Sequence, residues 1–133
     1  MEEPRYFLSD LVAIQHTPNR GRGIFALVDL PEGLLLETAP VIVMPGAQRT
    51  LIDQTVLHDY IFIWGEAEDQ CCMALGYVAL YNHASPANCD YLMDFKQQTI
   101  SIITVRSIAA GEELFINYNG DWNDEKAVWF TAS

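Results

Sequence analysis

Basic residues are scarce in this sequence, where 7 Lys and Arg residues stand against 18 Asp and Glu residues in a chain of 133, for a formal net charge of −11. A chain with this charge repels the phosphate backbone of nucleic acids, so direct binding to DNA or RNA is not expected. An acidic surface attracts basic partners, although surplus acid can also serve solubility alone. The charge therefore favours a Lys- and Arg-rich protein segment as partner.

Cysteine is also rare. The three cysteines, Cys71, Cys72 and Cys89, are odd in number and lack C-x-x-C spacing. This argues against a framework of paired disulfides and against the usual zinc site. A metal or thiol site built from these residues and His83 is one alternative, but adjacent cysteines seldom bind one ion together. We expect reduced thiols in the core.

We expect neither a leader segment nor a membrane span from this sequence. The N-terminus, MEEPRYFLSD, lacks the basic and apolar regions of a signal peptide. No apolar run approaches the ~18 residues that a membrane span needs. We therefore expect a single domain, residues 1–133, without membrane contact and in the cytoplasm, or in the nucleus if the source is eukaryotic or viral.

Short segments rich in β-branched and aromatic residues make up most of the chain, each bounded by Gly, Pro, Asn or Asp, as is typical of β-strands. The expected strands are residues 12–17, 23–30, 34–44, 60–65, 71–76, 89–95, 99–108 and 113–118. Residues 47–58 have helical spacing, and the stretch after Gly120 could form a turn or two of helix. The pattern predicts a mostly β fold of several small sheets with one or two short helices, and not a βαβ array.

Two of these segments, 89–95 and 99–108, are joined by only three residues and predict a β-hairpin. In the second segment Ile100 and Ile102 face one side while Ile103 faces the other. Both faces of the hairpin should therefore be partly covered.

Three separated motifs stand out: GRGIFA at 21–26, NH at 82–83 with Asn88, and GEELFINY at 111–118. Any one of them would be a weak signal, because G-x-G is common in turns. Together and in this order, with a fourth match in the turn PEG at 31–33, they resemble the SET-domain family of lysine methyltransferases. The resemblance covers about residues 11–122.

The resemblance implies a β-clip-like arrangement of short curved sheets in which the C-terminal segment threads beneath a loop and forms a pseudoknot. It also implies a variable, substrate-facing insert at about residues 45–65 and a C-terminal aromatic segment at 119–133. We expect a minimal, stand-alone domain, monomeric or homodimeric, without the zinc-binding segments that flank many family members. Its implied activity is transfer of a methyl group from S-adenosylmethionine to a lysine amine of a protein, possibly a histone or another basic protein, with S-adenosylhomocysteine as product.

By the same resemblance, the main chain around Arg22 and Gly23 holds the methionine end of the cofactor, together with the Asn82 side chain. His83 contributes backbone contacts near the adenine, on which Trp122 stacks. Glycine suits a turn where backbone approaches a ligand, and a carboxamide can both donate and accept hydrogen bonds.

Tyr118 matches the family's tyrosine whose hydroxyl lies beside the departing methyl group and the target nitrogen, so it is expected to serve catalysis and to contact the cofactor. Tyr91 falls where some members carry a second, catalytically important channel tyrosine. Ile116 and Phe115 are expected to line the substrate channel. An aliphatic residue at 116 opposite Tyr91 resembles members that favour monomethylation.

The loop after the Asn-His pair departs from the family pattern Asn-His-Ser-x-x-Pro-Asn. Ala84 replaces the serine, the proline is Pro86, and Ala87 stands in the usual proline position. The departure leaves open a SET-like module that binds cofactor or a basic peptide without transferring methyl. A separate alternative is a structural β-module used in assembly, which would explain exposed aromatic residues but leaves the three spaced motifs to chance.

Overall fold

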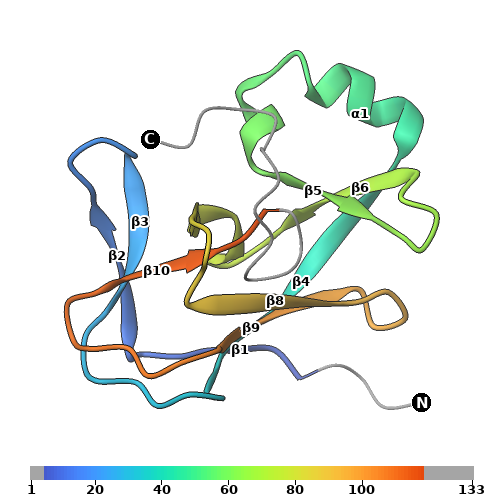
Figure 1. The fold of residues 1–133 in the computed structure, drawn as a ribbon. Coiled ribbons are helices and arrows are strands. Elements are labelled where there is room, and N and C mark those ends of the chain that lie inside the picture. Colours follow the sequence, from blue (N-terminus) through green and yellow to red (C-terminus); the bar gives the residue numbers. More distant parts are fainter. Residues whose placement is uncertain (1–4, 119–133) are drawn as a thin grey trace.

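The computed structural model describes residues 5–118, and Figure 1 shows two curved sheets with little helix. The strands are β1 (Phe7–Leu8), β2 (Val12–His16), β3 (Arg22–Ala26), β4 (Leu35–Pro45), β5 (Ile61–Trp64), β6 (Gln70–Ala74), β7 (Asn82–His83), β8 (Cys89–Asp94), β9 (Thr99–Thr104) and β10 (Glu113–Ile116). The helical elements are α1 (Gly46–Ile52) and the 3-10 helices η1 (Val56–Asp59) and η2 (Val78–Leu80). The prediction of a mostly β fold with short helices is confirmed.

The larger sheet is built on β4, the longest strand. Its strands run in the order β5-β6-β4-β9-β8, and β1 also pairs with β4. The first half of β4, up to Pro40, pairs with β9, and the second half, from Val41, pairs with β6; a register shift between Leu35 and Glu37 marks an irregularity near the start of the strand. β4 therefore pairs with different strands along its length, within one curled sheet.

The predicted hairpin is present as β8 and β9, which pair antiparallel from Cys89 opposite Thr104 to Asp94 opposite Thr99. Ile100 and Ile102 are fully buried, while Ile103 on the other face is half-buried. Alternation in the sequence thus reports correctly which face of the strand meets the core.

The smaller sheet has the order β2-β3-β10-β7. Its C-terminal strand, β10, is antiparallel to β3 on one side and parallel to β7 on the other. In Figure 1, β10 runs from the hairpin of β2 and β3 toward the middle of the molecule. This insertion of the last strand between two earlier segments agrees with the pseudoknot that the resemblance implies.

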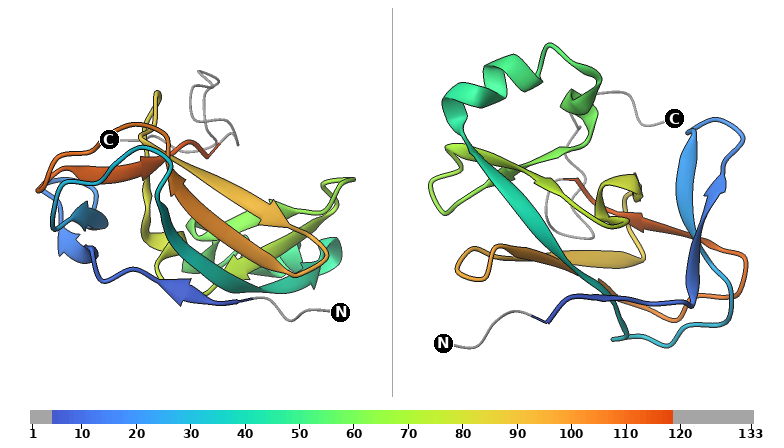
Figure 2. Two further views of the ribbon diagram at one scale, coloured as in Figure 1. Left: turned by 90° about the horizontal axis from the view of Figure 1, so that it is seen from below. Right: turned by 180° about the vertical axis from the view of Figure 1, so that it is seen from behind.

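The two ends of the molecule differ in character. Figure 2 shows the hairpin of β2 and β3 at one end and α1 at the other, with the larger sheet between them.

One core cluster contains the fully buried residues Leu36, Ile100, Leu114 and Ile116. All three cysteines are free and buried, as expected of core thiols.

Three predicted boundaries are wrong. The helix expected over 47–58 ends at Ile52, and η1 starts a new helical segment after Thr55, whose extended backbone interrupts the helix and whose hydroxyl accepts from the Leu57 N–H at 3.2 Å. The strand expected over 23–30 ends at Ala26. The strand expected over 99–108 ends at Thr104, and the following residues reach Leu30 only through an isolated bridge at Ile108.

No helix within residues 5–118 has the length and apolar character needed to cross a membrane.

Candidate active site

Tyr118 joins the C-terminal motif to the Asn-His motif. Its backbone N–H donates to Nδ1 of His83 at 3.0 Å, and its hydroxyl donates to the backbone carbonyl of Tyr81 at 2.7 Å. The His83 and Tyr118 rings lie 5.1 Å apart between centroids. Two stretches that are 35 residues apart in the sequence thus form one site.

His83 is held in its neutral form. A backbone N–H can only donate, so Nδ1 must accept and the ring proton must sit on Nε2. Burial lowers the pKa of His83 below its ordinary value, and the nearby Arg20 guanidinium lowers that pKa further. Arg20 also donates to the His83 carbonyl at 3.0 Å and lies over the Phe115 ring, 5.2 Å from its centroid. The sequence analysis missed Arg20, because a single arginine before a glycine turn carries no pattern.

The Tyr118 hydroxyl remains protonated at neutral pH. Burial raises the pKa of Tyr118 to about 12, although Arg20 acts in the opposite direction. The hydroxyl can therefore donate and orient, but it cannot serve as a proton acceptor in its phenolate form.

A cavity of about 350 Å³ lies against Tyr118. Its lining includes Tyr81 and Tyr91, and the Tyr91 hydroxyl lies 3.5 Å from the Tyr118 carbonyl oxygen, to which it donates. The Tyr91 ring also packs on Phe62, 5.3 Å away between centroids. The other lining residues are Arg49, His58, Asp59, Tyr60, Ile61, Ile63, Gly65, Glu68, Ala79, Met93 and Phe95. The cavity is thus largely aromatic and apolar, with charged side chains among its exposed residues.

A second cluster forms where β3, β7 and β10 meet. The Asn82 Nδ2 group donates to the Arg22 carbonyl at 3.2 Å and to Oε2 of Glu113 at 2.8 Å. A Cβ atom added to Gly23 would lie 2.5 Å from Glu113 Oε2 and 2.9 Å from Asn82 Nδ2. Only glycine at position 23 leaves room for these two polar side chains beside the backbone.

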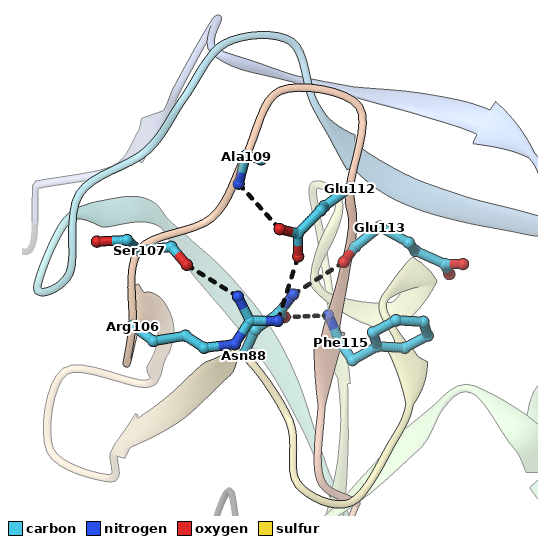
Figure 3. Close-up of polar contacts among 7 residues, drawn as sticks. All are labelled: Asn88, Arg106, Ser107, Ala109, Glu112, Glu113 and Phe115. Carbon is cyan, nitrogen blue, oxygen red and sulfur yellow. Dashed lines mark hydrogen bonds and ion pairs between the residues drawn. The ribbon is translucent and has the colours of Figure 1, made fainter.

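Asn88 fixes the position of β10. Its Nδ2 donates to the Glu113 carbonyl at 2.9 Å, and its Oδ1 accepts from the Phe115 N–H at 2.7 Å (Figure 3). Asn88 is buried, and Ala87 before it is buried too. The shifted proline in this loop therefore does not prevent the second asparagine of the motif from reaching the C-terminal strand.

The predicted site residues divide into four groups. Arg22, Gly23, Asn82 and His83 lie on β3 and β7, and Tyr91 and Tyr118 face the cavity. Ile116 is fully buried in the core, and Phe115 lies beneath Arg20. Neither of these two lines the cavity, so their place in a substrate channel stays a prediction. Trp122 lies outside the described residues. Within residues 5–118, no three His, Cys, Asp or Glu side chains are grouped to hold a metal ion.

Comparisons with known proteins agree with this geometry. Residues 21–119 match the family model of the SET domain. The chain is 34% identical over 117 residues to a histone-lysine N-methyltransferase of Schizosaccharomyces pombe, described as H3 lysine-37 specific, and the match covers 86% of this chain and 78% of the relative.

Solved structures share the fold. The crystal structure of a Plasmodium falciparum protein, described as a candidate histone methyltransferase, matches with a TM-score of 0.60 and 20% identity over 86% of this chain and 98% of that chain. A ctPRC2 complex with H3K27me3 matches with a TM-score of 0.68 and 22% identity over 80% of this chain, which spans 14% of that one.

The chain therefore belongs to the SET domain family, and the prediction of a protein-lysine methyltransferase of this family is confirmed.

Proposed function

We propose that the chain uses S-adenosylmethionine as methyl donor, bound by the cluster of Arg22, Gly23, Asn82 and His83. The fit rests on the cluster at Gly23, a buried position without a side chain where two polar side chains, those of Asn82 and Glu113, converge. The carboxylate of Glu113 gives this cluster a negative charge, which suits a cationic donor. When bound, S-adenosylmethionine supplies a methyl group on a positively charged sulfur.

Tyr118 carries this proposal, because it contacts both halves of the site. Its side chain lines the cavity, while its backbone and hydroxyl are bonded to His83 and to the Tyr81 carbonyl, the residue next to Asn82. In the proposed reaction the cavity admits the lysine side chain, and Tyr118 holds the amine in line with the methyl group. Such positioning is the main contribution that the protein makes.

The aromatic cavity also favours the neutral form of the substrate lysine. A lysine ammonium has an ordinary pKa of about 10.4, so its deprotonation at pH 7.4 costs about 4 kcal/mol. An apolar lining disfavours the charged form and reduces that cost. Tyr91, whose hydroxyl is held toward Tyr118, restricts the space around the amine, which supports monomethylation as the product.

The substrate is proposed to be a basic segment of a protein. Asp59 and Glu68 are exposed and line the cavity, so positively charged neighbours of the target lysine are favoured. A histone is the first substrate to test, because the yeast relative is described as a histone H3 enzyme, and such a substrate would place the protein in the nucleus. We propose that the domain acts as a monomer or a homodimer.

The test combines methyl transfer and binding. The protein is incubated with labelled S-adenosylmethionine and with basic peptides that include histone H3 segments, and S-adenosylhomocysteine binding is measured by calorimetry. Tyr118→Phe is expected to lose about 100-fold or more in transfer rate, because it removes the hydroxyl oxygen, whose proton is donated to the Tyr81 carbonyl and which can therefore orient the amine by accepting a hydrogen bond from it. Its affinity for S-adenosylhomocysteine should change less than about threefold.

Two results would contradict the proposal in different ways. Cofactor binding without transfer to any peptide would favour a binding module that has lost the reaction. A wild-type protein that binds no S-adenosylhomocysteine would refute the cofactor assignment itself.

A further inference from the structure

Glu113 occupies an unexpected place in the cofactor cluster. It follows Glu112 in the GEEL motif, yet the two carboxylates point in opposite directions (Figure 3). Glu112 bonds to Arg106 at 3.2 Å and to the Ala109 N–H at 3.1 Å, away from the cluster. The Glu113 carboxylate instead accepts from Nδ2 of Asn82 on the neighbouring strand β7. Adjacent, chemically identical side chains therefore have separate environments.

The contacts of Nδ2 decide how the Asn82 carboxamide is oriented. This nitrogen has two acceptors, Glu113 Oε2 at 2.8 Å and the Arg22 carbonyl at 3.2 Å. If the carboxamide were turned round, Oδ1 would face these two oxygens with no hydrogen between them. The orientation with Nδ2 toward these two acceptors is therefore fixed, and Oδ1 points away from them, outward from the Glu113 carboxylate, with no hydrogen-bond donor to it among the described residues.

This inference rests on the proposed function. We infer that Glu113 is a positioning residue, which locks Asn82 as a hydrogen-bond acceptor and thereby selects the positively charged α-amino group of the cofactor's amino-acid part. An outward carbonyl oxygen backed by a carboxylate favours a cationic donor over a neutral or acidic group.

Ligand preference tests the inference. Calorimetry compares S-adenosylhomocysteine with its deaminated analogue, in which hydrogen replaces the α-amino group, on wild type, Glu113→Gln and the matched control Glu112→Gln. Wild type and Glu112→Gln are expected to prefer the amino-bearing ligand by about tenfold or more. In Glu113→Gln the preference should fall below about threefold, because the glutamine amide has no net charge and can turn its own NH2 toward Asn82.

A merely structural role for Glu113 would weaken both ligands equally and leave the preference intact, and that result overturns the inference. A wild type without preference overturns it as well. If wild type binds neither ligand, the proposed cofactor site is wrong and the inference is wrong with it. If wild type binds both ligands but Glu113→Gln keeps the preference, only the role of Glu113 is wrong, so the two failures are distinguishable.

Folding of each variant is checked by thermal unfolding. If Glu113→Gln does not fold, the comparison uses Glu113→Asp, whose carboxylate is one methylene shorter and withdraws from Nδ2. A preference below about threefold is then expected, and an unchanged preference refutes the role.

Discussion

Glu37, in β4, has a buried carboxyl group. At high pH the variant Glu37→Gln should therefore have a larger free energy of unfolding than wild type. The side chain is only 1% exposed. One oxygen accepts from the Tyr77 N–H at 2.9 Å, and the other is buried without a hydrogen-bond partner among the described residues. Gly76, whose φ is +68°, leaves room for this carboxyl group, since an added Cβ would collide with Oε2 of Glu37.

The size of the effect follows from the pKa of Glu37. Desolvation by burial raises it from 4.5 to about 7, although the Tyr77 N–H acts in the opposite direction. Below pH 4.5 both folded and unfolded chains are protonated. Between pH 4.5 and 7 the unfolded chain releases its proton first, so stability falls as pH rises. A pKa shift of this size corresponds to about 3 kcal/mol of free energy of unfolding, which the protein has lost once the pH is above 7.

Urea unfolding of wild type and Glu37→Gln between pH 4.5 and 8 measures this loss. Glutamine keeps an acceptor for the Tyr77 N–H and cannot ionise. The variant should nearly match wild type at pH 4.5 and exceed it by about 3 kcal/mol at pH 8. Glu112→Gln, at a carboxyl group whose pKa is lowered by the Ala109 N–H and by Arg106, should not gain stability over wild type as the pH rises. A difference between Glu37→Gln and wild type that does not change with pH would refute the reasoning.

Three further predictions concern the site. Gly23→Ala should weaken S-adenosylhomocysteine binding about tenfold, because the added Cβ displaces the polar side chains beside it. The control Gly21→Ala lies in open space at φ +71°, so it should lower the free energy of unfolding by about 1 kcal/mol and leave binding unchanged. Calorimetry measures the binding, and urea unfolding measures the stability. Asn88→Ala should lose about 3 kcal/mol in urea unfolding, since two buried backbone groups lose their partner. Tyr91→Phe should shift products toward higher methylation in mass spectra, and an unchanged distribution would exclude its steric role.

Local sequence pattern predicted the larger sheet well. The alternation around Ile100 and Ile102 identified the hairpin, because one face of each strand is buried. It could not predict β7, which has only two residues and exists because β10 pairs with it. The helix after Pro45 was overextended, because the apparent helical spacing continued past Thr55, where a side-chain hydrogen bond favours a new segment.

The site was predicted from motifs and not from periodicity. Asn82, His83 and Tyr118 were identified together; a hydrogen bond joins Tyr118 to His83, whereas the Asn82 side chain bonds to Arg22 and Glu113. Glu113 was missed because an acidic residue that begins a strand is usually exposed. Glu37 was missed too, although a lone carboxylate within an apolar strand was a visible signal: charged residues are rarely buried without a specific environment.

The charges around the cavity explain how an acidic protein can prepare a neutral amine. Burial is the main cause of the raised pKa of Tyr118, but Arg20 lowers that pKa and Asp59 raises it, so both charges act at the phenol. Asp59 and Glu68 are exposed and attract an approaching ammonium. In the proposed reaction the aromatic side chains of the lining disfavour the same positive charge, and so does the Arg20 guanidinium, whose field acts at Tyr118. Tyr118 keeps its own proton in this reaction, so we propose that the ammonium proton leaves past the exposed carboxylates of Asp59 and Glu68, and that attraction and deprotonation are served by different parts of the lining.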